Sequence, residues 1–184
     1  MIKKLEDWII IDKISLSDLK KIKKQINLII KKLQEINTDN LSTRGDSIQY
    51  NVEDSLDLKL LDLLKKIVID KYDQVFETDD INLKLTNAWT VLAKKTGWHQ
   101  LHQHNQNFSK HENAISVVLF LETPKKITKN YPGEFYYVYQ KDNDSYIRYN
   151  SIIPNDGSIV LMPTWLWHGA YPSAGKRQTL NLEF

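Results

Sequence analysis

Residues 157–184 read GSIVLMPTWLWHGAYPSAGKRQTLNLEF, and this stretch decides the fold. Its runs 157–162 and 167–171 are apolar or aromatic, as is typical of strands. Residues 172–175, PSAG, have the composition of a turn. The run 177–184 is apolar at alternate positions in its second half. The end of the chain is therefore expected to form three strands, which favours a β-rich fold.

The last two of these strands are expected to pair as a hairpin. A four-residue loop would set Ala170 opposite Arg177 and His168 opposite Thr179, with all four side chains on one face. Arg177 would then lie diagonally from His168, with about 7–8 Å between their backbones. A guanidinium grips a carboxylate through two charge-assisted hydrogen bonds, so Arg177 and the Thr179 hydroxyl are candidates to bind a dicarboxylic acid. The other interpretation of Arg177 is a surface ion pair.

Further strands are expected upstream, in runs that either alternate or are continuously apolar. They cover 6–12, 83–92, 114–121, 134–140 and 145–153. The run AISVVLFL at 114–121 is typical of a buried strand. Asp142, Asn143 and Asp144 have the composition of a hairpin turn between the last two runs.

Two amphipathic helices are expected before most of these strands. The first follows Ser15 or Ser17, either of which can cap it, and the second covers about 55–76. Their apolar stripes, at helical spacing, are Leu19, Ile22, Ile26, Ile29, Leu33 and Ile36 in the first and Leu56, Leu60, Leu63, Leu64, Ile67 and Val75 in the second. Residues 37–51 are polar, so we expect a loop there with a brief extended piece.

This order of elements predicts an α+β fold. The expected architecture is a double-stranded β-helix, a jelly-roll or cupin-like barrel, preceded by two N-terminal helices. With 184 residues, the chain has the length of one domain. We expect a single domain over 1–184, in which a helical leader, 1–80, packs on a catalytic barrel core, 81–184.

His102 and His104 are the residues with the clearest chemical meaning. Side chains two residues apart share one face of a strand, and each imidazole offers a neutral nitrogen to a divalent metal. His168 on a later strand would complete a facial set of three ligands that leaves coordination positions open. The alternative places the pair on a solvent face. We expect His99, which has the opposite parity to His102, and His111 at the surface or behind the ligands.

Composition excludes several classes of site. The chain has no cysteine, so disulfides, thiolate metal sites and cysteine nucleophiles are excluded. The net charge of +2 gives no reason to expect nucleic acid or an acidic membrane as a partner. Acidic residues interrupt the first apolar run, MIKKLEDWIII, which therefore reads as neither a signal peptide nor a membrane span. We expect a cytoplasmic protein.

Three stretches are similar to the Fe(II)- and 2-oxoglutarate-dependent oxygenases, and especially to small members from phages and marine bacteria. They are NAWTVLAKKTGWHQLHQH at 87–104, ISVVLFLETP at 115–124 and IIPNDGSIVLMPTWLWHGAYPSAGKRQTLNLEF at 152–184. The most specific part is the last stretch, in which His168 is followed nine positions later by Arg177 and then by Thr179.

The resemblance implies a non-haem Fe(II)- and 2-oxoglutarate-dependent oxygenase, with hydroxylation of a small molecule or a protein side chain as the default reaction. It implies that His102 and His168 bind iron, and that Arg177 and Thr179 hold the distal carboxylate of 2-oxoglutarate. The cofactors would be Fe(II), 2-oxoglutarate as cosubstrate and O2, and the chemistry is compatible with ascorbate as a further reductant. The long Leu/Ile stripes are compatible with a homodimer.

The chain departs from the common family pattern at one position. That pattern is His-x-Asp, whereas His104 stands where the carboxylate is expected. A neutral third ligand leaves the metal site one charge more positive. We take His102, His104 and His168 as the metal-binding and catalytic set, with the alternative that a carboxylate such as Glu112 or Glu134 replaces His104.

Two other functions fit parts of the pattern. A cupin-type metal enzyme that does not use 2-oxoglutarate would share the barrel, because 97–104 loosely resembles the first cupin motif and the spacing up to His168 matches the second. However, the glutamate expected four or five residues after His104 is missing, and Arg177 would have no role. A non-catalytic jelly-roll binding module would explain the missing carboxylate, but not why Arg177 and Thr179 accompany His168.

Overall fold

The computed structural model describes residues 3–5, 9–35, 41–43, 47–76, 82–104, 114–125, 132–140, 145 and 147–184. The helical elements are α1 (Leu16–Glu35), the short 3-10 helix η1 (Glu53–Ser55) and α2 (Leu58–Phe76). The strands are β1 (Lys3–Leu5), β2 (Ile9–Lys13), β3 (Leu41–Thr43), β4 (Ser47–Asn51), β5 (Asn87–Ala93), β6 (His99–His102), β7 (Ile115–Glu122), β8 (Phe135–Tyr139), β9 (Arg148–Ile152), β10 (Ser158–Pro163), β11 (Trp167–Ala170) and β12 (Arg177–Glu183).

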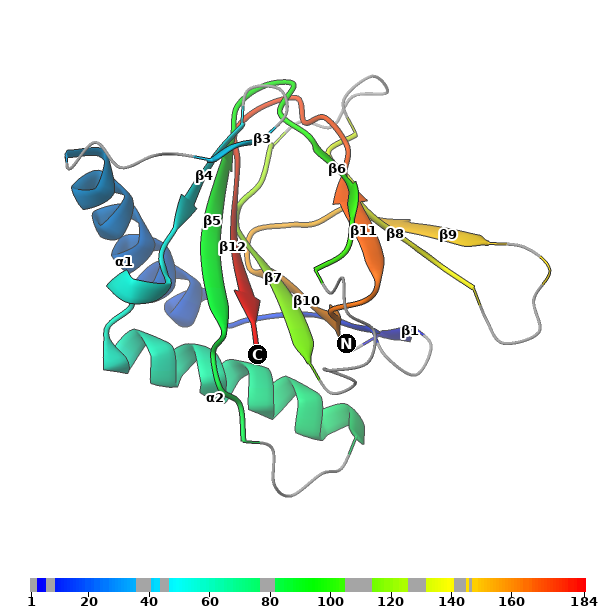
Figure 1. Ribbon diagram of the computed structural model, residues 1–184, viewed down its shortest axis with the longest axis horizontal. Coiled ribbons are helices and arrows are strands. Elements are labelled where there is room, and N and C mark those ends of the chain that lie inside the picture. The colour runs from blue at the N-terminus through cyan, green and yellow to red at the C-terminus, as the bar shows by residue number, and fades with distance from the viewer. Residues whose placement is uncertain are drawn as a thin grey trace.

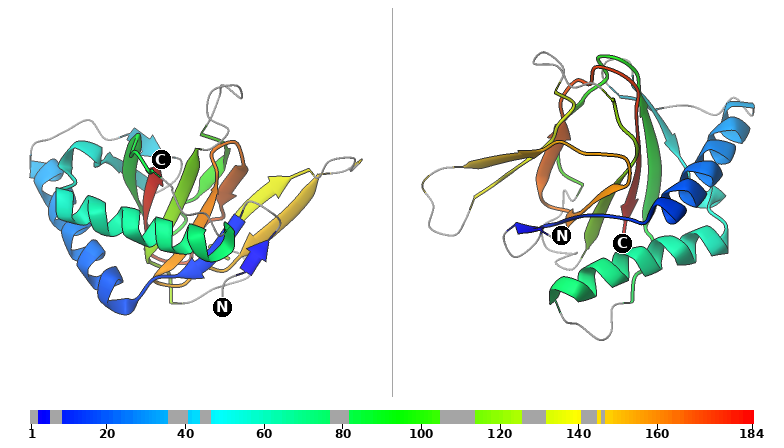
Figure 2. Two further views of the ribbon diagram at one scale, coloured as in Figure 1. Left: turned by 90° about the horizontal axis from the view of Figure 1, so that it is seen from below. Right: turned by 180° about the vertical axis from the view of Figure 1, so that it is seen from behind.

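The strands form two antiparallel sheets (Figure 1). The larger sheet has the order β1-β2-β10-β7-β12-β5-β4-β3, and the smaller has the order β6-β11-β8-β9. Figure 2 shows that α1 and α2 lie on the side of the larger sheet that faces away from the smaller one. This is the α+β double-stranded β-helix with leading helices that the sequence predicts.

Strand β7, in the middle of the larger sheet, is buried on both faces, which explains why its residues 117–121 are all apolar. Val117, Leu119 and Leu121 belong to the apolar core shared with α1 and α2. Val118 and Phe120 alternate with them and pack in the second core, against the smaller sheet. Because successive side chains point to opposite faces, a strand between two cores needs apolar residues at every position.

The two helices form as their apolar stripes predict. The Ser15 hydroxyl accepts a hydrogen bond of 3.1 Å from the backbone N–H of Asp18, which is the N-cap contact expected of a serine at this position. Leu19, Ile22 and Ile26 of α1 are then buried. In the described part of the chain, neither helix is long and apolar enough to span a bilayer.

Segment 37–51 contains more regular structure than its polarity predicts. Strand β4 pairs along its length with β5, and β3 pairs with β4 at the edge of the larger sheet. On β4, Tyr50 is buried and Ile48 is partly exposed. Strands β8 and β9 pair as expected, while the predicted turn at 142–144 lies outside the described residues.

The predicted C-terminal hairpin is wrong. Strand β11 pairs with β6 and β8 of the smaller sheet, whereas β12 pairs with β5 and β7 of the larger sheet. Ala170 is therefore not opposite Arg177, and His168 is not opposite Thr179. The turn at 172–175 carries the chain from one sheet to the other. Its composition predicts a change of direction but does not distinguish a hairpin from a crossing between sheets.

Candidate metal centre

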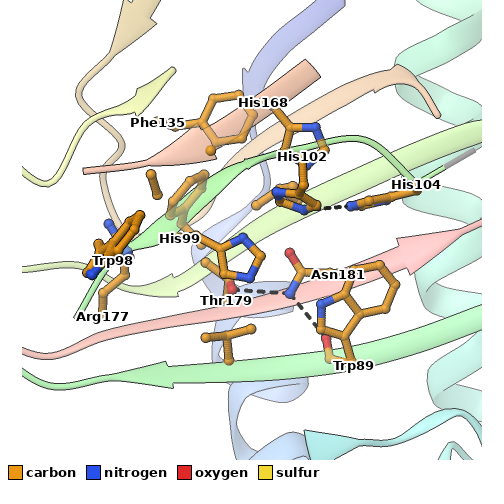
Figure 3. Close-up of a pocket in the computed structure, with 15 residues that line it drawn as sticks. Trp89, Trp98, His99, His102, His104, Phe135, His168, Arg177, Thr179 and Asn181 are labelled. Carbon is orange, nitrogen blue, oxygen red and sulfur yellow. Dashed lines mark hydrogen bonds between the residues drawn. The ribbon is translucent and has the colours of Figure 1, made fainter. Parts of the chain in front are cut away.

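Two neighbouring strands of the smaller sheet bring three histidines together. His102 ends β6 and is the register partner of His168 on β11. His104 follows two residues after His102, where its backbone N–H donates a hydrogen bond of 3.0 Å to the Thr164 carbonyl. One ring nitrogen from each imidazole lies within 4.8 Å of the other two. The structure therefore assembles the set His102, His104 and His168 that the sequence predicts (Figure 3).

An oxygen atom holds the outer nitrogen of each imidazole. His102 Nδ1 lies 2.8 Å from the Gln100 carbonyl oxygen, and His168 Nδ1 lies 2.9 Å from that of Leu166. A carbonyl oxygen only accepts hydrogen bonds, so both Nδ1 atoms carry the proton and both Nε2 atoms keep a lone pair. Such oxygen partners are typical of histidines that bind metals, because they fix the tautomer and the orientation of the ring.

The inner nitrogens are placed as ligands of one cation. His102 Nε2 and His104 Nε2 are 3.0 Å apart. Two nitrogens that each lie about 2.1 Å from one metal, at right angles, are separated by about 3 Å. Two ring nitrogens at this distance share either a proton, as a hydrogen bond, or a metal cation. The spacing of this pair therefore fits two neighbouring ligands of a divalent metal, and His168 offers a third nitrogen within 4.8 Å.

Burial favours the neutral form of His102 and His168, which is the form in which histidine binds a metal. Loss of solvent lowers the pKa of His102 and lowers the pKa of His168 well below its ordinary value, and neighbouring imidazoles lower both further. His168 is 3% exposed and its ring packs 5.6 Å from that of Phe135, measured between centroids. Protonation therefore competes weakly with metal binding at neutral pH.

Arg177 is a buried cation at the other end of the same pocket. It is 4% exposed and donates hydrogen bonds to the carbonyl oxygens of Tyr171, at 3.0 Å, and Gly97, at 3.5 Å. Burial lowers its pKa to about 10, so the guanidinium stays charged at neutral pH. No carboxylate pairs with it among the residues that the structure describes. A buried charge without a counter-ion is costly, so this position suits an anionic ligand.

Polar side chains follow one face of β12 from Arg177 towards the histidines. Arg177, Thr179, Asn181 and Glu183 share this face, because side chains alternate along a strand. Arg177, Thr179 and Asn181 line the pocket. Asn181 Nδ2 lies 3.2 Å from Thr179 Oγ1 and 3.3 Å from the Trp89 carbonyl oxygen. The strand thus supplies a row of hydrogen-bonding groups with a guanidinium at one end.

His99 lines the pocket, contrary to the prediction from strand parity. His168 pairs with His102 and Ala170 pairs with His99, so β6 has one extra residue, a β-bulge, between the two pairs. The bulge returns His99 to the face of His102, and their ring centroids are 4.4 Å apart. In Figure 3, His99 lies between Arg177 and the other imidazoles. His111 and Glu112 lie outside the described residues.

Sequence reasoning missed His99 and Glu183 among the charged or titratable residues of the site. No sequence signal marks the bulge that places His99 in the pocket. Glu183, in contrast, shares the parity of Arg177 and Thr179, so continuing their pattern along the strand could have found it. Its carboxylate lies 2.9 Å from His104 Nδ1. Glu134 belongs to no metal-ligand cluster found among the described residues.

The pocket as a whole is mostly apolar with polar groups at two ends. It encloses about 490 Å³ of space, part of it open to solvent. Trp89, Trp98, Phe120 and Phe135 contribute to its walls. Apolar walls with a few convergent polar groups are typical of sites for small ligands. The arrangement can bind a metal at the histidines and an anion at Arg177 within one pocket.

Several solved structures share this fold at low sequence identity. AviO1 from Streptomyces viridochromogenes Tue57 is 14% identical, with a TM-score of 0.64 over 96% of this chain and 89% of that one. HygX from Streptomyces hygroscopicus, with nickel and 2-oxoglutarate bound, is 12% identical, with a TM-score of 0.60 over 95% of this chain and 81% of that one. A Pseudomonas putida prolyl-4-hydroxylase is 11% identical, with a TM-score of 0.62 over 96% of this chain and 91% of that one. These similarities establish the fold.

The sequence itself matches one family model. No curated protein matches the chain significantly. The family described as "Putative 2OG-Fe(II) oxygenase" matches residues 87–184, which is more than half of the chain. The matched region contains all three clustered histidines, together with Arg177 and Thr179. This chain therefore belongs to the family of 2-oxoglutarate- and Fe(II)-dependent oxygenases.

Proposed function

We propose that this oxygenase binds Fe(II) through His102, His104 and His168 and binds the distal carboxylate of 2-oxoglutarate through Arg177 and Thr179. One observation carries the assignment: three imidazoles, each held at Nδ1 by an oxygen, converge in a pocket that also contains a buried guanidinium without a carboxylate partner among the described residues. The first group of residues fits the metal, and the second fits the anion.

The expected reaction is hydroxylation. A substrate C–H bond becomes C–OH while O2 is consumed and 2-oxoglutarate is converted to succinate and CO2, and the metal and cosubstrate supply this oxidising chemistry. The protein's own residues bind and orient the participants. The oxygen atoms on each Nδ1 keep the imidazoles in the tautomer that offers Nε2 to the metal.

Arg177 recognises the carboxylate at the distal end of the cosubstrate. A dicarboxylic keto acid spans the pocket from the histidines to the guanidinium, and there its second carboxylate supplies the counter-charge that the described protein residues do not. The Thr179 hydroxyl, on the same face of β12, adds a hydrogen bond to that carboxylate. A keto acid without the second carboxylate lacks both interactions.

The prime substrate is inferred to be a small molecule or a peptide. The apolar and aromatic walls of the pocket favour a ligand of this kind. Among structures of similar fold, HygX has been solved with hygromycin B bound, and a prolyl hydroxylase from Trichoplax adhaerens has been solved with a peptide fragment of hypoxia inducible factor. These two ligands, a small molecule and a peptide, support the expectation that this hydroxylase acts on one of the two classes.

The proposal extends to the organisation of the chain. We infer that 1–184 forms one domain, because side chains of α1, α2 and the larger sheet share a continuous apolar core. Cytoplasmic location, a homodimeric state and a role for ascorbate stay predictions.

The experiment that tests the assignment compares two keto acids. Binding of 2-oxoglutarate and of 2-oxobutyrate, which lacks the distal carboxylate, is measured by calorimetry on Mn(II)-loaded protein without oxygen. We expect 2-oxoglutarate to bind roughly tenfold to a hundredfold more tightly, because hydrogen bonds to charged groups contribute about 1.5–3 kcal/mol. In Arg177→Gln, the two affinities should become similar while Mn(II) binding is retained.

Two results would contradict the assignment. Equal affinity for the two keto acids in the wild-type protein would remove Arg177 and Thr179 from the cosubstrate site. Preference for 2-oxoglutarate that persists in Arg177→Gln would assign the distal carboxylate to another residue.

A further inference from the structure

Glu183 is the one carboxylate that contacts the histidine cluster in the described part of the chain. It lies near the end of β12, where its Oε1 is 2.9 Å from His104 Nδ1. The side chain of His104 is 7% exposed and that of Glu183 is 18% exposed, so water screens the contact weakly. The third ligand of the proposed metal site therefore has a carboxylate directly behind it.

We propose that Glu183 is a positioning residue that acts through His104, and that it supplies from behind this imidazole the negative charge that a ligating carboxylate supplies in a two-histidine, one-carboxylate site. The inference rests on the proposed metal site. It concerns the position at which this chain departs from the common His-x-Asp pattern. The carboxylate is retained in this arrangement, but one side chain further from the metal.

The backbone builds this contact into the sheet. Glu183 on β12 and Ser116 on β7 are register partners, so their side chains start side by side. The Ser116 hydroxyl, which is fully buried, also lies 3.0 Å from His104 Nδ1. Side chains from two adjacent strands of the larger sheet thus contact the Nδ1 atom of His104, which follows β6 of the smaller sheet. The contact is part of the packing between the sheets.

Only the carboxylate fixes the tautomer of His104. A hydroxyl can donate or accept, so Ser116 is compatible with a proton on either ring nitrogen. A carboxylate accepts, so Glu183 holds a proton on Nδ1 and makes Nε2, which lies 3.0 Å from His102 Nε2, the nitrogen that is available to a metal. The carbonyl oxygens of Gln100 and Leu166 do the same for His102 and His168, without a charge.

The charge distinguishes Glu183 from those two carbonyl oxygens. Three neutral imidazoles leave the full charge of a divalent metal uncompensated in a pocket that already contains the Arg177 cation. A carboxylate behind one ligand makes that imidazole a stronger donor and offsets part of this charge. Glu183 should therefore raise metal affinity more than a neutral hydrogen-bond acceptor would.

The first test measures metal affinity rather than turnover. Co(II) is titrated into metal-free wild-type protein and into Glu183→Gln, which keeps the size of the side chain but removes its charge. We expect a tenfold to hundredfold loss of affinity, the usual range for a residue behind a metal ligand. Glu122→Gln is the matched control, because Glu122 pairs with Lys23 and Lys176 and lies outside the cluster. Its affinity should equal that of the wild type.

The second test moves the carboxylate. In His104→Asp, the new carboxylate can bind the metal, but Glu183 loses the imidazole through which it acts. Adding Glu183→Gln should therefore cost little further Co(II) affinity, so that the double variant binds about as tightly as His104→Asp alone. The same substitution would then weaken binding strongly in the wild-type background and weakly in the His104→Asp background. Such a dependence on position 104 is not expected from a residue that only supports the strand.

Each contrary outcome has a separate meaning. Wild-type affinity in Glu183→Gln, with circular dichroism unchanged, overturns the role of Glu183 and leaves the metal site standing. Additive losses in the double variant also overturn it, since they show that Glu183 does not act through position 104. Failure of the wild-type protein to bind Co(II) overturns both this inference and the proposed metal site.

Discussion

His168 and Arg177 are separated by nine positions in the sequence, lie on different sheets, and line one pocket. The turn at 172–175 carries the chain from β11 to β12, so the two side chains enter the pocket from its two walls. A ligand between them contacts both sheets. The connection between the consecutive strands β11 and β12 therefore determines how the proposed metal and cosubstrate sites are placed relative to each other.

Replacing His168 should remove the metal. His168→Ala deletes the most buried of the three imidazoles, and two nitrogen ligands alone bind a divalent metal far less tightly. We expect metal content after loading and desalting to fall from one ion per chain to near zero. Gln140→Ala, at an exposed position in the same sheet region, is a suitable control. Stoichiometric metal in His168→Ala would exclude this residue from the ligand set.

A methyl group at Gly169 should disturb the histidine pair beside it. A Cβ atom there would lie 2.9 Å from the His99 carbonyl oxygen and 2.6 Å from the Tyr136 ring. The tyrosine can move, but the backbone of β6 cannot move without shifting His102 relative to His168. We expect Gly169→Ala to lose about 1–3 kcal/mol of stability and to bind Co(II) more weakly.

The double variant Gly169→Ala with Tyr136→Ala separates the two contacts. Because the contact with the backbone remains, removal of the tyrosine ring should restore neither the stability nor the affinity. Full recovery would show that the Tyr136 side chain, rather than the spacing of β6 and β11, limits the size of residue 169.

The metal-free protein should lose stability in acid. Burial lowers the pKa of His99 to about 3 and also lowers the pKa values of His102 and His168. In the unfolded chain these groups titrate near pH 6.5, so below this pH the unfolded state binds more protons than the folded state. The free energy of unfolding should therefore fall as the pH drops from about 6.5 towards 3.

Thermal melting near pH 7.5 and near pH 5 measures this loss of stability. In His99→Gln one of the three groups no longer titrates, so the difference between the two melting temperatures should be smaller than in the wild type. An equal difference would contradict the burial of the His99 imidazole.

A cavity in the core between the helices and the larger sheet should lower the free energy of unfolding. Leu119 is 1% exposed and packs in the apolar core shared with α1 and α2. Leu119→Ala should cost about 2–5 kcal/mol in urea unfolding. Leu58 is 77% exposed, so Leu58→Ala should change stability by no more than about 0.5 kcal/mol. Similar losses in both variants would contradict this packing.

The sequence predicts the parts of the site that depend on local periodicity. Arg177 and Thr179 both line the pocket, as expected from the alternation of side chains along β12. This expectation holds although the predicted hairpin does not form, because the alternation depends only on the strand itself and not on its partner. The facial set of His102, His104 and His168 is also predicted, since it needs only short spacing and one later strand. The narrower likeness to phage and marine relatives stays a prediction.

The sequence does not predict features that depend on how strands meet. The bulge that turns His99 into the pocket arises from the pairing of β6 with β11. The contact between Glu183 and His104 arises from the packing of the two sheets. The crossing from β11 to β12 has the same turn composition as a hairpin. To predict any of these three features, one must know which strands are neighbours in space. The residue pattern of a single strand does not contain that information.

The most direct test of the account is an anaerobic titration of the Fe(II)-loaded protein with 2-oxoglutarate, followed by visible absorption. A keto acid chelated to Fe(II) gives a weak charge-transfer band. The band should appear in the wild-type protein and saturate near one 2-oxoglutarate per iron. It should be absent in His168→Ala and require far more 2-oxoglutarate in Arg177→Gln. Stoichiometric iron with no band at any concentration of 2-oxoglutarate would contradict the proposed sites for metal and cosubstrate.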